Sequence, residues 1–167
     1  MRGVDMLIVS LKKHFPARWP EWFMAGQMTA WGCYIATHPE LFTSESTRQV
    51  FAGMASMVNG DSPAAVWGLA AVVIGMTRAF ALFINGAYTR TPLIRLVMSF
   101  LGAFIWTQVV IGLIKSGIPN ADIMVYSGLV ILDIVSAYRA ATDVVYAEKA
   151  RHDLKKRPAS GVEYIFV

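Results

Sequence analysis

The sequence has few residues with which to build a reactive or metal-binding site. Its single cysteine is Cys33, and its three histidines, His14, His38 and His152, are far apart in the chain. One cysteine excludes an intramolecular disulfide and a cysteine-rich metal site, and no histidine has the spacing of a helical zinc motif. The serines of the apolar segments have no histidine near them to act as a base. We therefore expect no enzyme, no metal and no cofactor.

Charged residues are also scarce. Only 16% of the 167 residues are charged, 56% are hydrophobic, and the mean hydropathy is +0.49. Soluble domains of this length contain more charge and less apolar material. The composition therefore predicts an integral membrane protein.

Four apolar stretches are long enough to cross a bilayer, because a hydrocarbon core of about 30 Å needs roughly 20 residues of helix. Proline, glycine and asparagine separate them, and the first is the weakest because it contains Gln27 and Thr29. The predicted fold is all-α, an integral membrane four-helix bundle that covers residues 19–145. The spans are residues 19–37, 63–88, 93–114 and 118–141.

Two shorter segments have an apolar helical face. Residues 1–18 and residues 43–58 both repeat apolar side chains every three or four positions, which predicts short amphipathic helices lying on the membrane surface. Residues 146–167 form a basic tail, whose apolar end offers a docking peptide for a protein partner. A terminus with no special role is the simpler interpretation of that end.

Lysine and arginine collect on one side of the predicted spans, which places both termini in the cytoplasm. This bias explains the pI near 9.4 without nucleic-acid binding, and the basic tail residues are expected to contact lipid headgroups. The cytoplasmic set is Arg2, Lys12, Lys13, Arg18, Arg90, Arg95, Lys149, Arg151, Lys155, Lys156 and Arg157, against Arg48 and Lys115 outside.

Two charges of opposite sign lie inside predicted spans. Arg78 is about fourteen residues from Ala64, and Asp133 is about twelve from Ala121, so their depths differ by only ~3 Å. A charge in hydrocarbon costs from ~3 kcal/mol upward unless a partner or water receives it. We therefore predict that the two side chains pair.

The pair allows three interpretations. It can clamp two spans together, it can line a hydrated path, or each charge can contact another copy of the chain. Asn85, Gln108 and Ser136 are candidates for the same intramembrane polar network, and Arg139 and Asp143 are predicted at the interfacial rim, four residues apart.

Small residues at four-residue spacing let helices approach closely, and Gly75 with Ala79 and Ser99 with Ala103 have this spacing. Four helices of this length bury little internal surface, so we also expect homo-oligomers in contact with membrane lipids.

Four stretches carry a resemblance to a known type of protein: residues 19–22 (WPEW), 75–86 (GMTRAFALFING), 91–95 (TPLIR) and 133–140 (DIVSAYRA). They resemble small polytopic membrane proteins encoded by tailed phages and prophages. The resemblance implies a place in the bacterial inner membrane and a role in lysis of the holin kind, or one in the virion or host envelope. The small size and basic tail are similar to those of holins, whereas four spans with charges inside them differ from the commonest holin layouts.

The resulting hypothesis is a non-enzymatic, self-assembling protein that permeabilises or remodels the inner membrane. One alternative is a small ion or solute channel or transporter subunit that uses Arg78, Asp133, Asn85 and Gln108. Another is an envelope or virion scaffold that makes contacts through residues 39–62 and the tail.

Overall fold

The computed structural model describes residues 2–58, 60, 62–84, 91–117 and 121–156. Across these ranges the regular structure is helical, with no strand, which confirms the all-α class. The elements are α1 (Arg2–Thr37), the 3-10 helix η1 (Pro39–Phe42), α2 (Arg48–Ser56), α3 (Pro63–Phe83), α4 (Thr91–Ser116) and α5 (Asp122–Lys156).

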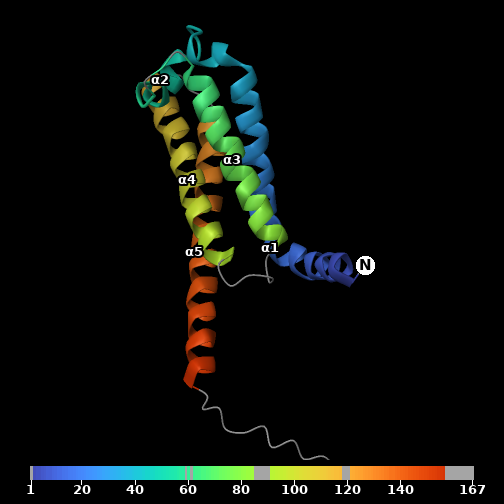
Figure 1. Ribbon diagram of the computed structural model, residues 1–167. Coiled ribbons are helices and arrows are strands. Elements are labelled where there is room, and N and C mark those ends of the chain that lie inside the picture. The colour runs from blue at the N-terminus through green and yellow to red at the C-terminus, as the bar shows by residue number, and fades with distance from the viewer. Residues whose placement is uncertain (1, 59, 61, 85–90, 118–120, 157–167) are drawn as a thin grey trace, which may run out of the picture.

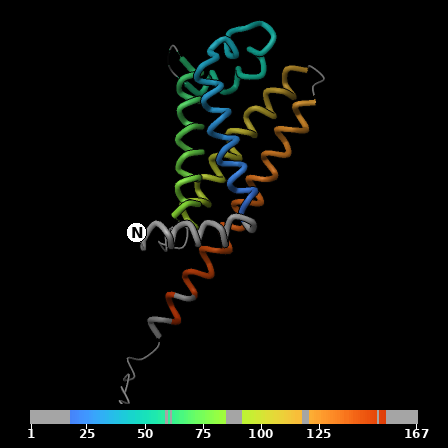
Figure 2. Tube along the Cα trace, turned by 90° about the vertical axis from the view of Figure 1, so that its right-hand side faces the viewer, coloured from blue at the N-terminus to red at the C-terminus, as the bar shows by residue number. Residues whose placement is uncertain are grey.

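Four long helices, α1, α3, α4 and α5, lie side by side, and η1 and α2 close one end of the molecule (Figures 1 and 2). At the opposite end α5 continues beyond its neighbours. Helix α1 is kinked at Arg18, where φ is −123° and ψ is 16°, two residues before Pro20. Of the predicted interfacial segment, residues 1–18, residues 2–17 precede this kink as helix, but the side chains of residues 1–17 lie outside the described ones.

Three helices among the described residues are long and apolar enough to cross a membrane, namely Pro63–Phe83, Pro92–Ser116 and Asp122–Asp153. The first predicted span, on α1, is not one of them, because Glu21, Gln27 and Thr29 make its sequence more polar. Most of the exposed side chains along the apolar parts of these three helices are large hydrophobic residues, as a lipid-facing surface requires. Exposed members include Leu69, Val73, Met76 and Phe80 of α3, Val97, Phe100 and Phe104 of α4, and Ile131, Ile134 and Val145 of α5.

Helix α1 packs most closely on α3, through glycines that bring the two backbones together. A Cβ at Gly32 would lie 2.7 Å from the Gly68 carbonyl oxygen, and one at Gly68 would lie 2.7 Å from the Ala36 backbone nitrogen. Gly75 likewise faces Ala25 and Thr29. The small-residue spacing at Gly75 thus does mark a close approach, and the helix that approaches is α1.

The amphipathic stretch predicted on the membrane surface packs on the bundle instead. Its helical core is the nine-residue α2, whose apolar side chains Val50, Phe51 and Met54 are buried. Gly112 of α4 makes room for the Val50 carbonyl, since a Cβ there would overlap this oxygen. The indole nitrogen of Trp67 also donates a 2.8 Å hydrogen bond to the Met54 carbonyl. The apolar face of this helix is therefore covered by protein, and its place at the membrane surface stays a prediction.

Candidate functional site

The two charges predicted inside the spans form a salt bridge. Arg78 of α3 donates from Nη1 to Oδ1 of Asp133 on α5, and both side chains are fully buried. The predicted pairing is confirmed. Each charge neutralises the other, so neither has to be solvated by lipid or by the apolar side chains around it.

The other two long helices complete the surroundings of this pair. Gly102 of α4 provides the space for the carboxylate, because a Cβ at that position would lie 2.5 Å from Asp133 Oδ2. It would also lie 3.3 Å from the Met28 Cε atom of α1. All four long helices therefore meet at the Arg78–Asp133 pair.

Several buried polar atoms at this meeting point have no hydrogen-bond partner within the described part of the chain. They are Nε and Nη2 of Arg78, Oδ2 of Asp133 and Nε1 of Trp106. Buried polar groups are nearly always bonded to protein or ordered water. The cluster thus has three donor atoms that water could accept hydrogen bonds from, and one carboxylate oxygen that could accept a hydrogen bond or a proton.

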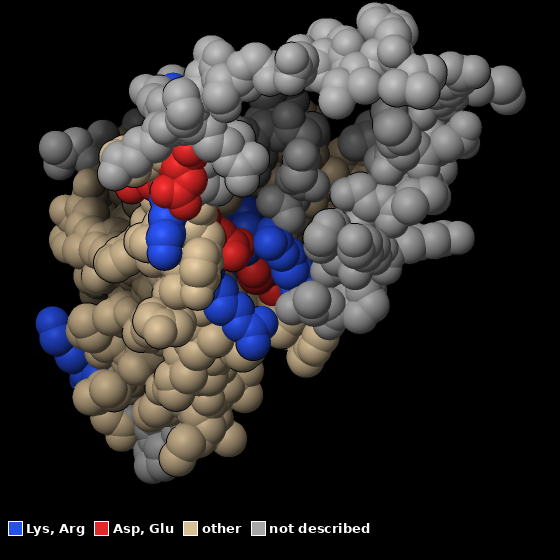
Figure 3. Space-filling view, turned by 90° about the horizontal axis from the view of Figure 1, so that it is seen from below, with Lys and Arg blue, Asp and Glu red and all other residues tan. Residues whose placement is uncertain are grey.

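A second group of charges joins three helices near the kink of α1. Arg95 of α4 contacts Glu21 of α1 at two points, Nε to Oε2 and Nη2 to Oε1, each 2.7 Å long. Its Nη1 donates to Asp143 Oδ2 of α5 at 2.9 Å, and Arg18 Nη2 donates to the same oxygen at 3.1 Å. We call these four residues the rim network. Figure 3, viewed from below, shows basic and acidic side chains meeting at this end.

The rim network is electrically neutral and partly shielded from solvent. The side chains of Arg95 and Glu21 are 1% and 2% exposed, whereas that of Asp143 is 35% exposed. Burial, and then the positive charge of Arg95, lowers the pKa of the Arg18 guanidinium, against the opposing effect of Asp143. A two-point arginine–carboxylate contact is among the strongest polar contacts in proteins.

Sequence reasoning did not identify the rim network. It assigned Arg95 only to membrane orientation and considered Asp143 with Arg139 on the same helix. In the structure Arg139 is exposed, and Asp143 bonds to Arg18 and Arg95 from other helices. The available signal was that Glu21 and Arg95 have opposite charges and begin two predicted spans on the same side.

The remaining predicted residues fall outside these clusters. Gln108 is half-buried, and no hydrogen bond joins it to either member of the buried pair in the described residues. Ser136 is buried, but its hydroxyl donates to the Leu132 carbonyl of its own helix at 2.8 Å. Lys149 and Arg151 are exposed on the projecting part of α5. Asn85, Arg157 and the apolar end of the tail, and the side chains of Lys155 and Lys156, lie outside the described residues.

Three of the four ion pairs in the described residues lie between the same two halves of the bundle. The four long helices form two pairs, α1 with α3 and α4 with α5, and we call the surface between these pairs the seam. The contacts Arg78–Asp133, Arg95–Glu21 and Arg18–Asp143 each join one pair of helices to the other. Charge therefore stabilises the seam, whereas close backbone packing stabilises the α1–α3 pair.

Comparison of the chain with protein families, with curated proteins and with solved structures found no match. Within the described ranges no three His, Cys, Asp or Glu residues come together as a metal site.

Proposed function

We propose that this chain is a non-enzymatic integral membrane protein that assembles in the bacterial inner membrane and permeabilises or remodels it, in the manner of a holin. The observation that carries the proposal is the inversion of polarity between surface and interior. Phe100, Leu69 and Ile131 are more than 60% exposed on three helices, while Arg78 and Asp133 are buried between them. A lipid solvent favours this arrangement.

The way in which α1 lies on α3 supports a fourth membrane crossing. Backbone contacts join the two helices from Ala25 to Ala36, so a membrane that surrounds α3 also surrounds this part of α1. We propose four crossings with both termini in the cytoplasm. The rim network then lies at the cytoplasmic side, near the exposed Lys149 and Arg151 of α5.

Cysteine labelling tests this topology. In a Cys33→Ser background, a cysteine in place of Arg48 lies on α2 and one in place of Lys149 lies on α5, and both positions are exposed. We expect a membrane-impermeant maleimide to label the first in cells with a permeable outer membrane, and the second only after lysis. Labelling of both in unlysed cells would contradict the proposed topology.

A groove between α4 and α5 supports assembly. It encloses about 250 Å³, opens on the apolar outer face and offers a neighbouring copy a recess for a large side chain. Its lining residues are Leu96, Phe100, Ala103, Ile134, Ala137, Tyr138 and Ala141.

Controlled expression with a voltage-sensitive dye tests the activity. We expect the wild-type chain to depolarise the membrane once copies accumulate, and cross-linking to reveal oligomers. Ala103→Trp fills the groove and should abolish both effects, whereas Val73→Trp adds the same ring to an exposed position of α3 and should not. Expression to high level of a monomer that leaves the potential intact would refute the proposal.

A second candidate function is conduction along the seam, which the unpartnered polar atoms of Arg78, Asp133 and Trp106 favour. Proteoliposomes test it by proton and ion flux. Asp133→Asn should abolish flux while the protein stays folded, and Asp153→Asn on the exposed part of α5 is the matched control. Equal flux from all three proteins would exclude this path.

A further inference from the structure

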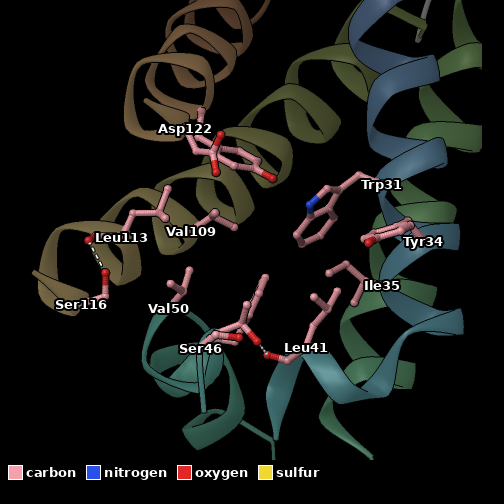
Figure 4. Close-up of a pocket in the computed structure, with 13 residues that line it drawn as sticks. Trp31, Tyr34, Ile35, Leu41, Ser46, Val50, Val109, Leu113, Ser116 and Asp122 are labelled. Carbon is pink, nitrogen blue, oxygen red and sulfur yellow. Dashed lines mark hydrogen bonds between the residues drawn. The ribbon is translucent and has the colours of Figure 1, made fainter. Parts of the chain in front are cut away.

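A cavity of about 420 Å³ lies at the end of the molecule opposite the rim network. The segments around it come from α1, η1, α2, α4 and the start of α5 (Figure 4). Pockets for small organic ligands typically enclose about 300–1,000 Å³ and are mostly apolar with a few polar groups. This cavity has that size and composition, and it lies at the α2 end of the seam, between α1 and the α4–α5 pair, apart from the groove between α4 and α5.

The walls of the cavity are apolar on several sides. Ile35, Val50 and Leu113 extend from α1, α2 and α4 toward a common space (Figure 4). Hydroxyl groups come from Ser46 and Ser116. Such a site favours an apolar body that carries one polar group.

Four aromatic residues line the same cavity, namely Trp31, Tyr34, Phe51 and Tyr126, and each ring packs against a neighbouring ring. Trp31 contacts Trp106 edge-to-face with ring centroids 5.1 Å apart, and Tyr126 lies 5.7 Å from Trp106. Tyr34 stacks on His38 at 4.2 Å and is 52% exposed, so it lies at the open side. Aromatic faces carry partial negative charge and attract cations.

The charged residue among the described lining residues of the cavity is acidic. Asp122 at the start of α5 is one of the lining residues, and no lysine or arginine is among them. A carboxylate near aromatic faces recognises an organic cation, and particularly a quaternary or primary ammonium. We propose that this cavity binds an ammonium group attached to an apolar body. The site does not depend on whether the protein permeabilises the membrane.

Two sources can supply this chemistry, a free amphiphilic ammonium or the amine headgroup of a membrane lipid. The primary test therefore uses nanodiscs of phosphatidylglycerol, which has no amine. Benzyltrimethylammonium is the probe, and neopentylbenzene is its uncharged carbon isostere. We expect saturable binding of the cation and about tenfold weaker binding of the isostere, the ratio that ~1.4 kcal/mol of charge recognition gives.

Variants assign the binding to this cavity. Asp122→Asn should lower the affinity for the cation several-fold and leave the affinity for the isostere unchanged. Tyr34→Leu should also lower the affinity for the cation, whereas Tyr34→Phe retains the aromatic face and should bind the cation as the wild type does. Asp153→Asn, at the far end of α5, is the control for a general loss of negative charge.

A further measurement identifies the natural source of the ammonium group. Weaker probe binding after addition of phosphatidylethanolamine to the nanodiscs would assign the cavity to a lipid amine, and unchanged binding would assign it to a free ammonium. Equal affinity for the cation and its isostere, or wild-type affinity in both Asp122→Asn and Tyr34→Leu, would overturn the proposal. A failure of depolarisation in the expression assay would leave this result unaffected.

Discussion

The close approach of α1 and α3 predicts opposite effects for two glycine-to-alanine changes in the same helix. Replacing a helical glycine by alanine stabilises a helix by about 1 kcal/mol, because alanine has the higher propensity. A Cβ at Gly26 would meet no atom within 4 Å, so Gly26→Ala should show this gain. The same change at Gly32 adds its methyl group against the backbone of α3.

The cost at Gly32 follows from the contacts. Its Cβ would lie 2.7 Å from both the Gly68 oxygen and the Val72 nitrogen, about 0.7 Å inside the 3.4 Å at which ordinary contact begins. Backbone atoms cannot rotate away, so the two helices must separate. Overpacking of this kind costs about 1–3 kcal/mol. Gly32→Ala should therefore be less stable than Gly26→Ala by about that amount.

Equilibrium unfolding in mixed detergent micelles, followed by circular dichroism, gives the measurement. Both variants should retain the helical content of the wild type under native conditions. The reasoning would be refuted if Gly32→Ala were as stable as Gly26→Ala, because the α1–α3 backbone contact would then not exist in the folded protein.

Three further predictions concern other contacts. Asp133→Ala leaves Arg78 buried without a counter-ion and should lower the free energy of unfolding by about 3–5 kcal/mol in the same assay. Adding Arg78→Leu should recover most of this loss. An unchanged unfolding midpoint in Asp133→Ala would contradict the buried pair. Gly112→Ala should displace α2, seen as faster amide exchange in residues 48–56 with α3 unaffected, and unchanged exchange would argue against the contact with Val50. Arg95→Lys cannot reproduce the two-point contact with Glu21 and should lose about 1–3 kcal/mol, whereas equal stability would mean that the rim network contributes little.

The sequence predicted the contact whose two residues could be placed at the same depth by counting residues along the predicted spans. Arg78 and Asp133 are isolated inside apolar runs, so their depths could be compared directly. Glu21 and Arg95 stand at the ends of runs, where a charge can be solvated at the interface, and their pairing was therefore missed. Spacing also indicated that Gly75 permits close packing, but the choice of α1 as the neighbour depends on the tertiary arrangement.

The position of α2 and the pocket beside it could not be read from periodicity. Val50, Phe51 and Met54 show that the helix has an apolar face, and such a face is satisfied equally by lipid or by protein. The contact with protein depends on Gly112, far along the chain, because this glycine lets the backbone of α2 approach α4. The pocket depends on the same arrangement, since its lining comes from segments spread between Trp31 and Tyr126.

The location of the ion pairs at the seam limits how the two helix pairs can move against each other. An interface of apolar side chains can slide by small amounts, because one contact replaces another at similar free energy. Here a shift by one helical turn, about 5.4 Å, would separate Arg78 from Asp133 and Arg95 from Glu21 at the same time. Smaller shifts would also stretch these ion pairs, so the charges hold the two helix pairs in one register.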